Sequence, residues 1–308
     1  MRLDTLGVDE SVSILFPPEV LVDELAELPV TTTVVDGSRG LDDCQAVVTF
    51  SYWDAYDDLG WVHSIQSGVD QFPFDRMRAA DVALTNSTGI HGDAIGEAVA
   101  SYALAFSRRL HEHVANQGEA TWSPPAWDDA WTVRGERACV VGLGTLGRGV
   151  VDRLTGLGVE ITGVRRTPTP EPGVDDVYTP SKLRAAVSDA RFVVAAVPLT
   201  DDTRGLIDAD VLAAMREDAY LINVARGAVV DQSALVDALD GGEIAGAALD
   251  VFETEPLPES SPLWGMDEVI VSPHCAGFTH RYHEHVGSIV AENVERLRAD
   301  GDLANRVL

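Results

Sequence analysis

The segment VVGLGTLGRGV constrains the fold of this chain more than any other part of its sequence. Its glycines, in the pattern Gly142-x-Gly144-x-x-Gly147, stand between an apolar strand-like run and a helical pattern. In that context they let the backbone approach a pyrophosphate, to which the helix N-terminus offers N–H groups and partial positive charge. A tight turn without a ligand is the alternative. We predict a dinucleotide site here, with Thr145 and Leu146 in contact with the ligand.

An alternation of strands and helices surrounds this turn and predicts a parallel sheet covered on both faces. Strands are expected at Arg137–Leu143, Glu160–Val164, Phe192–Val197, Tyr220–Asn223, Ala245–Leu249 and Val269–Ser272. Helices are expected between them. One begins at Thr179-Pro180, and another runs from Asp231 to Gly241-Gly242, because suitable cap residues stand at these positions.

The first third of the chain repeats the alternation, so the 308 residues fit two α/β domains. Strands are expected at Ser11–Phe16, Ala46–Tyr52, Trp61–Gln66 and Val82–Ser87. A long helix is expected over His91–Ala115, followed at 121–131 by a surface crossing into the second domain, whose prolines exclude a helix interior. The final helix, Arg281–Ala299, has no strand after it and is expected to return to the first domain.

The charge of the chain is strongly negative, with 50 acidic residues against 22 Lys plus Arg. The only lysine is Lys182. Such a surface repels nucleic-acid phosphates and anionic membranes, so neither is an expected partner. The acid is spread along the whole chain. This favours a halophilic surface over an unusually acidic mesophilic one.

The cysteines and histidines predict no metal site. Cys44, Cys139 and Cys275 match no zinc or disulfide spacing and are expected to be buried free thiols in a reducing compartment. The HEH runs at 111–113 and 283–285 place histidines two apart, on different faces of a helix. The N-terminus lacks an apolar signal region and no run approaches 18 apolar residues, so we expect a cytoplasmic protein.

Two arginines occupy a position where an acid is usual. Arg165 and Arg166 lie about 20 residues past the glycine turn, where dinucleotide-binding folds carry an Asp or Glu for the adenine ribose. Guanidinium groups instead favour a 2′-phosphate, and Thr167 would add a hydroxyl donor. We therefore predict NADP(H). A surface pair balancing acids such as Glu160 and Glu171 is the alternative.

Three side chains with complementary chemistry follow predicted strands. They are Arg226, Glu255 and His274. Ligands of doubly wound sheets bind at the carboxyl ends of strands, so the three can converge on one crevice. A His exchanges protons near neutral pH, a carboxylate orients it, and an Arg binds a substrate carboxylate. The plain alternatives are a surface ion pair, a loop acid and a buried core histidine.

At these motifs the sequence resembles the D-isomer-specific 2-hydroxyacid dehydrogenases. The resemblance covers nearly the whole chain and rests on the glycine turn and on SIQSGVD (64–70), TNSTGIHGDAIGEAV (85–99), VPLTDDTRGLI (197–207), NVARG (223–227), LDVFETEPLP (249–258), SPHCAG (272–277) and AENVERLRADGDLANRV (291–307). It implies that Arg226, Glu255 and His274 are catalytic. It also implies two Rossmann-like domains: a flavodoxin-like substrate domain (1–104 and 279–308) and a dinucleotide-binding domain (105–278) through which a homodimer forms.

The resemblance also extends the candidate site. Further cofactor contacts are expected at strand ends, from Val197, Pro198, Thr203, Val224, Ala225, Asp250, Ala276 and Gly277. Backbone N–H groups of Ser67, Gly68 and Val69 would form an anion nest for the substrate carboxylate, although by sequence an ordinary turn is equally compatible. Tyr52 and Trp53 suggest an apolar wall of the substrate pocket, or else exposed loop aromatics.

We therefore expect an NADPH-dependent reductase that converts 2-oxo acids to D-2-hydroxy acids. The arginine pair is similar to that of glyoxylate/hydroxypyruvate reductases, and Glu255, where formate dehydrogenases have Gln, argues against formate. Two alternatives remain. One is a dinucleotide-sensing, co-repressor-like binding protein, for which the expected long tails are lacking. The other is a phosphoglycerate dehydrogenase, for which no added cationic cluster or regulatory domain is seen.

Overall fold

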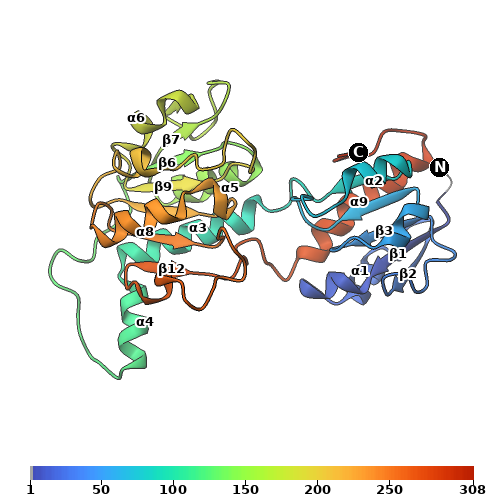
Figure 1. The fold of residues 1–308 in the computed structure, drawn as a ribbon, viewed down its shortest axis with the longest axis horizontal. Coiled ribbons are helices and arrows are strands. Elements are labelled where there is room, and N and C mark those ends of the chain that lie inside the picture. The colour runs from blue at the N-terminus through green and yellow to red at the C-terminus, as the bar shows by residue number, and fades with distance from the viewer. Residues whose placement is uncertain (1–2) are drawn as a thin grey trace. The chain divides into compact units, whose positions relative to one another are not determined.

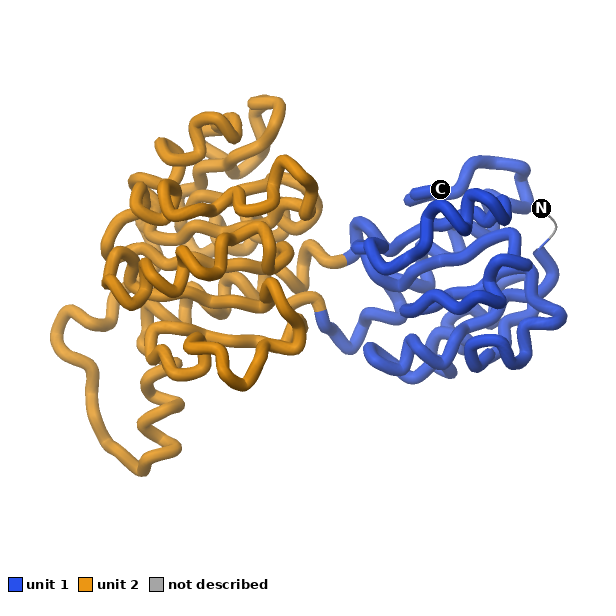
Figure 2. The backbone as a smooth tube through the Cα atoms, viewed as in Figure 1, with its two compact units in different colours: residues 1–90, 278–308 blue, residues 91–277 orange. Residues whose placement is uncertain are grey.

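The computed structural model describes residues 3–308 and divides into two compact units (Figure 2). Unit 1 comprises the described residues up to Ile90 together with Phe278–Leu308, and unit 2 comprises His91–Gly277. Each contains one parallel sheet with helices packed against it (Figure 1). The predicted fold class, two doubly wound α/β domains, is confirmed.

Unit 1 has a parallel sheet in the order β2-β1-β3-β4-β5, the flavodoxin-like order. Its strands are β1 (Thr5–Asp9), β2 (Thr31–Val35), β3 (Ala46–Thr49), β4 (Trp61–Ser64) and β5 (Ala83–Asn86). Its helices are α1 (Pro18–Glu24), α2 (Phe74–Ala79), α9 (Tyr282–Arg298) and the 3₁₀ helices η1 (Glu10–Ile14) and η2 (Asp54–Asp58).

The strand expected over Ser11–Phe16 is wrong. The first strand ends earlier, at Asp9, and a 3₁₀ helix follows. The Asp9 carboxylate causes this turn: one oxygen accepts from Ser11 N at 2.9 Å and the other from Gly37 N at 2.8 Å. Val12 is fully buried, so the apolar residues that suggested a strand here belong to a helical turn that packs into the core.

The last helix, α9, packs in unit 1 as expected. Residues at a spacing of four, from Tyr282 through Val286 and Val290 to Val294, are buried in one cluster with Leu6 of β1. This is the apolar stripe of an amphipathic helix that covers a sheet face. The C-terminal segment is therefore part of the first unit's core.

Unit 2 has a parallel sheet in the order β12-β11-β10-β9-β6-β7-β8. Its strands are β6 (Arg137–Val141), β7 (Glu160–Val164), β8 (Asp176–Tyr178), β9 (Phe192–Ala195), β10 (Tyr220–Asn223), β11 (Gly246–Leu249) and β12 (Val269–Val271). Its helices are α3 (Gly92–Ser107), α4 (Leu110–Gly118), α5 (Thr145–Gly156), α6 (Leu183–Val187), α7 (Ala209–Leu212), α8 (Gln232–Asp240) and the 3₁₀ helices η3 (Pro180–Lys182), η4 (Gly227–Val229) and η5 (Pro262–Gly265).

Most expected elements are found, some with shorter ends. Helix α8 follows the N-cap Asp231, whose carboxylate accepts from Ala234 N at 3.0 Å, and it ends before Gly241-Gly242 as predicted. At Thr179-Pro180 a single 3₁₀ turn comes first and α6 follows. The edge strands β2 and β8 were not predicted, because both lie in segments without a clear apolar period and β8 has only three residues.

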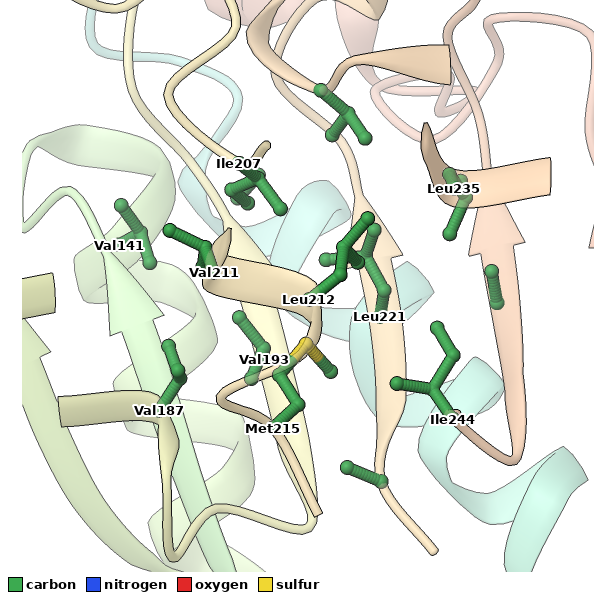
Figure 3. Packing of buried hydrophobic residues seen from close by; sticks show 14 of the residues in the cluster. Val141, Val187, Val193, Ile207, Val211, Leu212, Met215, Leu221, Leu235 and Ile244 are labelled. Carbon is green, nitrogen blue, oxygen red and sulfur yellow. The ribbon is translucent and has the colours of Figure 1, made fainter. Parts of the chain in front are cut away.

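Both faces of the sheet in unit 2 are buried, which explains its nearly continuous apolar strands. Neighbouring residues of a strand point to opposite faces, yet Val193 and Val194 of β9 are both fully buried, as are Leu221 and Ile222 of β10. On one face they pack with α7 and α8, and Figure 3 shows Leu212 of α7 close to Leu221. On the other face they pack with α3 and α5. Burying each such side chain contributes about 1.5–3 kcal/mol to the free energy of folding.

Helix α3 belongs to unit 2, so the first boundary lies at 90/91 and not at the expected 104/105. Its backbone touches that of α5. A Cβ on Gly149 would stand 1.9 Å from Gly92 O, and one on Gly96 would stand 2.3 Å from Gly149 O. The glycines at this crossing therefore allow α3 to pack closely against α5, which lies on the sheet of unit 2. The second boundary, at 277/278, differs from the expected 278/279 by one residue.

The single helix expected over His91–Ala115 is interrupted. Arg109 adopts a left-handed conformation (φ 55°), so α3 ends at Ser107 and α4 starts at Leu110. None of the residues of α4 is buried. The segment 121–131 is on the surface as expected, but it lies inside unit 2 and is not the crossing between domains.

The cysteines are free, as predicted, but they differ in burial. Cys44 and Cys139 are buried, whereas Cys275 is only partly buried, so the expectation of a buried thiol is wrong there. Cys275 lies in the loop after β12, next to His274, where the backbone leaves the sheet. Within residues 3–308, no helix is long and apolar enough to cross a membrane.

His63 is a fully buried histidine of unit 1 with a strongly lowered pKa. It lies on β4 with no exposed surface, and its ring nitrogens pair with Thr85 Oγ1 (2.8 Å) and Ser87 Oγ (3.1 Å). Burial lowers the pKa of His63 to about 3 from its ordinary 6.5. The unfolded chain therefore binds this proton more readily than the folded protein does.

We predict that stability falls as pH decreases from about 6.5 towards 3, with His63 contributing up to about 1.4 kcal/mol per pH unit. His63→Gln should lower stability at pH 7 but flatten this slope. Urea unfolding across the pH range measures it, with the exposed His280→Gln as the matched control. An unchanged slope in His63→Gln would show that His63 does not cause the acid sensitivity.

Candidate functional site

The three candidate catalytic residues follow three neighbouring strands of unit 2. Arg226 comes after β10, Glu255 after β11 and His274 after β12, and these strands are adjacent and parallel. Carboxyl ends of parallel strands meet at one edge of the sheet, where doubly wound folds bind their ligands. The sheet order therefore brings the three residues to the same edge.

Glu255 and His274 form a direct pair. Glu255 Oε2 lies 2.8 Å from His274 Nδ1, and its other oxygen accepts from Phe252 N at 3.0 Å. The side chains are 36% and 49% exposed, so a ligand can reach the imidazole. Since Nδ1 donates to the carboxylate, Nε2 is the nitrogen left to exchange a proton with a substrate.

The loop that carries His274 is held by Asp250. His274 has φ 51°, an unusual conformation for a non-glycine residue, and its N–H donates to Asp250 O at 2.8 Å. The buried Asp250 carboxylate accepts from Ser272 Oγ at 2.7 Å and from the N–H groups of the two residues after His274 at 2.9 and 3.0 Å. Tyr102 OH of α3 lies 2.7 Å from Ser272 Oγ. This network fixes the position of the imidazole.

Arg226 is half-buried and held by its own segment. Its Nη1 donates to Ala225 O at 2.7 Å, and its carbonyl accepts from Asn223 Nδ2 at 3.1 Å. Behind it, a Cβ on Gly227 would stand 1.8 Å from Phe252 C, so this backbone packs directly against the segment that leads to Glu255. The guanidinium keeps further N–H donors for an anion.

The glycine turn between β6 and α5 has the shape that a pyrophosphate needs. Gly142 has φ 102°, and a Cβ on Gly147 would stand 1.8 Å from Gly142 O, so the turn excludes larger residues. Beside Gly144 a Cβ would meet nothing within 4 Å. Thr145 and Leu146 open helix α5. This open, N–H-rich helix start fits a dinucleotide phosphate.

The remaining cofactor candidates stand at the same edge of the sheet. They are Val197, Pro198 and Thr203 after β9, Val224 and Ala225 after β10, Asp250 after β11, and Ala276 and Gly277 after β12. Thr203 Oγ1 donates to Pro198 O at 2.6 Å and accepts from Thr200 N at 2.7 Å, which closes the loop after β9.

The two arginines after β7 differ from each other. Arg165 forms an ion pair with Glu171, Nη1 to Oε2 at 2.9 Å, as the alternative interpretation supposes. The other oxygen of Glu171 pairs with Nε of Arg148 at 2.9 Å. Arg166 and Thr167 are exposed. Arg165 therefore serves an internal ion pair, and Arg166 is presented to solvent.

Ser67, Gly68 and Val69 lie in unit 1 between β4 and α2. Ser67 Oγ donates to Ser87 O at 3.1 Å, and Asn86 Nδ2 donates to Ser67 O at 2.7 Å. These bonds tie the turn to the end of β5. The turn is thus held in one conformation, which is compatible both with an anion nest and with an ordinary turn.

Tyr52 and Trp53 follow β3 in unit 1 and behave differently. The Tyr52 hydroxyl donates to Asp57, and its ring packs edge-on against Tyr56 and Phe72. Trp53 is 47% exposed. Tyr52 is therefore anchored, and Trp53 is an exposed loop aromatic.

Sequence reasoning missed several residues around the site. Ser272 and Tyr102 support the His274 loop, and Arg148 completes the ion-pair cluster. For Arg148 the available signal was its place directly after the glycine pattern. Among the described residues, no group of His, Cys, Asp or Glu is arranged to hold a metal ion.

Comparisons with known proteins show which family the sequence and the fold match. The sequence model of "D-isomer specific 2-hydroxyacid dehydrogenase, NAD binding domain" matches residues 100–276. A glyoxylate reductase of Thermococcus kodakarensis is 31% identical over 284 residues, 90% of this chain and 82% of that protein.

Two solved structures are also similar. A D-isomer specific 2-hydroxyacid dehydrogenase family protein from Aeromonas salmonicida gives a TM-score of 0.87 at 25% identity. The match covers 100% of this chain and 99% of the A. salmonicida chain. A D-isomer specific 2-hydroxyacid dehydrogenase from Xanthobacter autotrophicus, in complex with NADPH and MES, gives 0.82 at 29% identity, with coverage of 100% and 98%.

We predict that Ser272→Ala lowers the free energy of unfolding by roughly 1.5–3 kcal/mol, because it removes a hydrogen bond to a buried carboxylate. Urea unfolding at neutral pH measures the loss. Ser101→Ala, the same change on the exposed face of α3, is the control and should cost little. Equal stability of the two variants would mean that Ser272 does not support the loop.

Proposed function

The chain belongs to the D-isomer-specific 2-hydroxyacid dehydrogenases, and we propose that it reduces 2-oxo acids to D-2-hydroxy acids with NADPH. It is an oxidoreductase with an NAD-binding type of domain. The observation that carries the proposal is the half-exposed Glu255–His274 pair, held on the strand ends beside Arg226. To reduce a 2-oxo acid, a protein must supply a proton, hold the group that donates it and bind the substrate carboxylate. His274, Glu255 and Arg226 have the chemistry for these three roles.

The side chains divide the reaction as follows. When bound, a nicotinamide cofactor would supply the hydride that adds to C2 of the 2-oxo acid. His274 gives the proton on Nε2 to the ketone oxygen, so the carbonyl becomes an alcohol and the imidazole becomes neutral. Glu255, through Nδ1, orients the imidazole and stabilises its charged form before the transfer. Arg226 binds the substrate carboxylate and polarises the carbonyl.

The remaining contacts follow from the same proposal. Gly142, Gly144, Thr145, Leu146 and Gly147 would hold the pyrophosphate, because the turn is open beside Gly144 and begins a helix. Taken by itself, the Ser67–Val69 turn of unit 1 offers backbone N–H groups that would bind a carboxylate. The T. kodakarensis relative is a glyoxylate reductase, so glyoxylate is the first substrate to test.

The proposed preference for NADPH rests on the end of β7. No Asp or Glu directly follows this strand in the sequence, and the exposed Arg166 and Thr167 offer donors to a 2′-phosphate. The similar X. autotrophicus structure is a complex with NADPH. A permanently charged guanidinium favours a dianion over a neutral ribose hydroxyl, and this difference sets the preference.

A homodimer through unit 2 is part of the proposal. Helix α4 and the loop after it extend away from the sheet of unit 2 (Figure 1) and expose large apolar side chains. Leu110 and Val114 are 54% and 60% exposed, and Trp122 and Trp127 are 98% and 87% exposed. Large exposed apolar side chains are typical of interaction sites, and a second copy of the chain would cover them.

We also propose a halophilic, cytoplasmic protein. The net charge of −28 is spread along the chain, and screening by salt relieves the repulsion that it creates. The three free cysteines fit a reducing compartment. Assays are therefore best made at high salt.

The first test of the reaction is His274→Ala. Turnover with glyoxylate and NADPH should fall at least about 10²-fold, the usual scale for losing a general acid. NADPH binding should stay nearly unchanged. The exposed His280→Ala serves as the control. If His274→Ala kept near-wild-type kcat, the proton would come from another group.

Cofactor choice is tested with Arg166→Ser. Loss of one charge-assisted contact, about 1.5–3 kcal/mol, should lower kcat/KM with NADPH roughly 10- to 100-fold. The value with NADH should hardly change. Arg184→Ser, an exposed arginine on α6, is the matched control. Equal losses with both cofactors would mean that Arg166 does not recognise the 2′-phosphate.

A further inference from the structure

One carboxylate bridges two arginines beside the proposed cofactor site. Glu171 lies in the loop before β8, and its two oxygens pair with Arg165 Nη1 and Arg148 Nε, each at 2.9 Å. The Glu171 side chain is only 12% exposed, against 28% for Arg165 and 57% for Arg148. The carboxylate is thus largely enclosed between the two guanidiniums.

The two arginines come from the two segments that dinucleotide folds use for phosphate and adenine ribose. Arg148 directly follows Gly147, and its N–H donates to Gly144 O at 2.9 Å in the first turn of α5. Arg165 follows β7, and its N–H donates to Tyr178 O at 3.0 Å. Both backbones are fixed, so both guanidiniums start from defined positions.

Glu171 differs from an ordinary surface acid of this chain. Glu160, at the other end of β7, pairs with Arg137 Nε at 3.1 Å, but its side chain is 57% exposed and meets water. An exposed pair of that kind contributes little. Glu171 instead neutralises one of two converging cations in an environment that water screens poorly. Its charge acts directly on any anion that approaches Arg165 and Arg148.

The ion pairs leave donors unused. A guanidinium has five N–H groups, and the contacts with Glu171 engage Nη1 of Arg165 and Nε of Arg148. A phosphate dianion would therefore be attracted by both arginines and repelled by the carboxylate between them. A ribose hydroxyl carries no charge and does not compete for the guanidiniums.

We propose that Glu171 is a specificity-determining residue that competes with the 2′-phosphate of NADP(H) for Arg165 and Arg148, and so limits the preference for NADPH over NADH. This inference rests on the proposed function, since it assumes that the adenosine end of the cofactor binds after β7. Arg148 then acts as an additional phosphate contact. The same site accepts NADH because the Glu171 ion pairs already satisfy the arginines when no phosphate is present.

The test measures binding of cofactor fragments to the full chain, without turnover. Calorimetric titration with 2′,5′-ADP and with 5′-AMP, at one fixed salt concentration, compares wild type, Glu171→Gln, Arg148→Gln and the control Glu160→Gln. Glu171→Gln should bind 2′,5′-ADP about tenfold more tightly, the scale of one charge-assisted contact, and 5′-AMP as before. Arg148→Gln should bind 2′,5′-ADP about tenfold more weakly, and Glu160→Gln should change neither.

The outcomes separate this inference from the proposed function. If wild type prefers 2′,5′-ADP but Glu171→Gln binds it no more tightly, the competition is wrong and Glu171 only holds the arginines in place. If neither protein distinguishes the two fragments, NADP recognition after β7 is wrong as well. The Arg148→Gln titration tests the inference independently of how Glu171→Gln folds: unchanged binding of 2′,5′-ADP would overturn the role of Arg148.

Discussion

The hydrogen bond between Glu255 Oε2 and His274 Nδ1 is the interaction on which the proposed reaction depends. It engages Nδ1 and so leaves Nε2 as the nitrogen that would face a substrate, and it places a negative charge next to the imidazole. Neither partner is free to move away. Phe252 N holds the carboxylate, and the Asp250 network holds the loop of the histidine. In the proposed reaction, this fixed loop would give the proton donor His274 a defined direction, which catalysis by proximity requires.

The parallel sheet of unit 2 is what makes that pair possible. Its strands are apolar on both faces, because helices cover both, and their order puts the ends of β10, β11 and β12 side by side. The glycine turn after β6 and the arginines after β7 stand at the same edge. Polar groups are therefore concentrated where the backbone leaves the sheet. The packed core holds the strands in place, and the residues proposed to act in catalysis lie at the strand ends.

The sequence predicted the parts that have a short-range cause. The glycine pattern required its strand and helix, and the apolar runs located most strands of both sheets. The parts it did not predict depend on contacts between distant residues. Helix α3 packs against α5 at Gly149, so α3 belongs to unit 2 and the unit boundary lies before it. The Asp9 carboxylate accepts two backbone hydrogen bonds, and a 3₁₀ helix follows it where the strand Ser11–Phe16 was expected. The Glu171 ion pairs depend on the path of an irregular loop, which no periodicity encodes.

The central claim is tested most directly by the product of the unmodified enzyme. The purified protein would be incubated at high salt with NADPH and 2-oxobutyrate, and the hydroxy acid formed would be quantified by chiral chromatography. We expect D-2-hydroxybutyrate in an amount equal to the NADPH consumed. Formation of the L isomer, or consumption of NADPH without a hydroxy acid, would contradict the assignment of this site as a D-specific 2-oxo acid reductase.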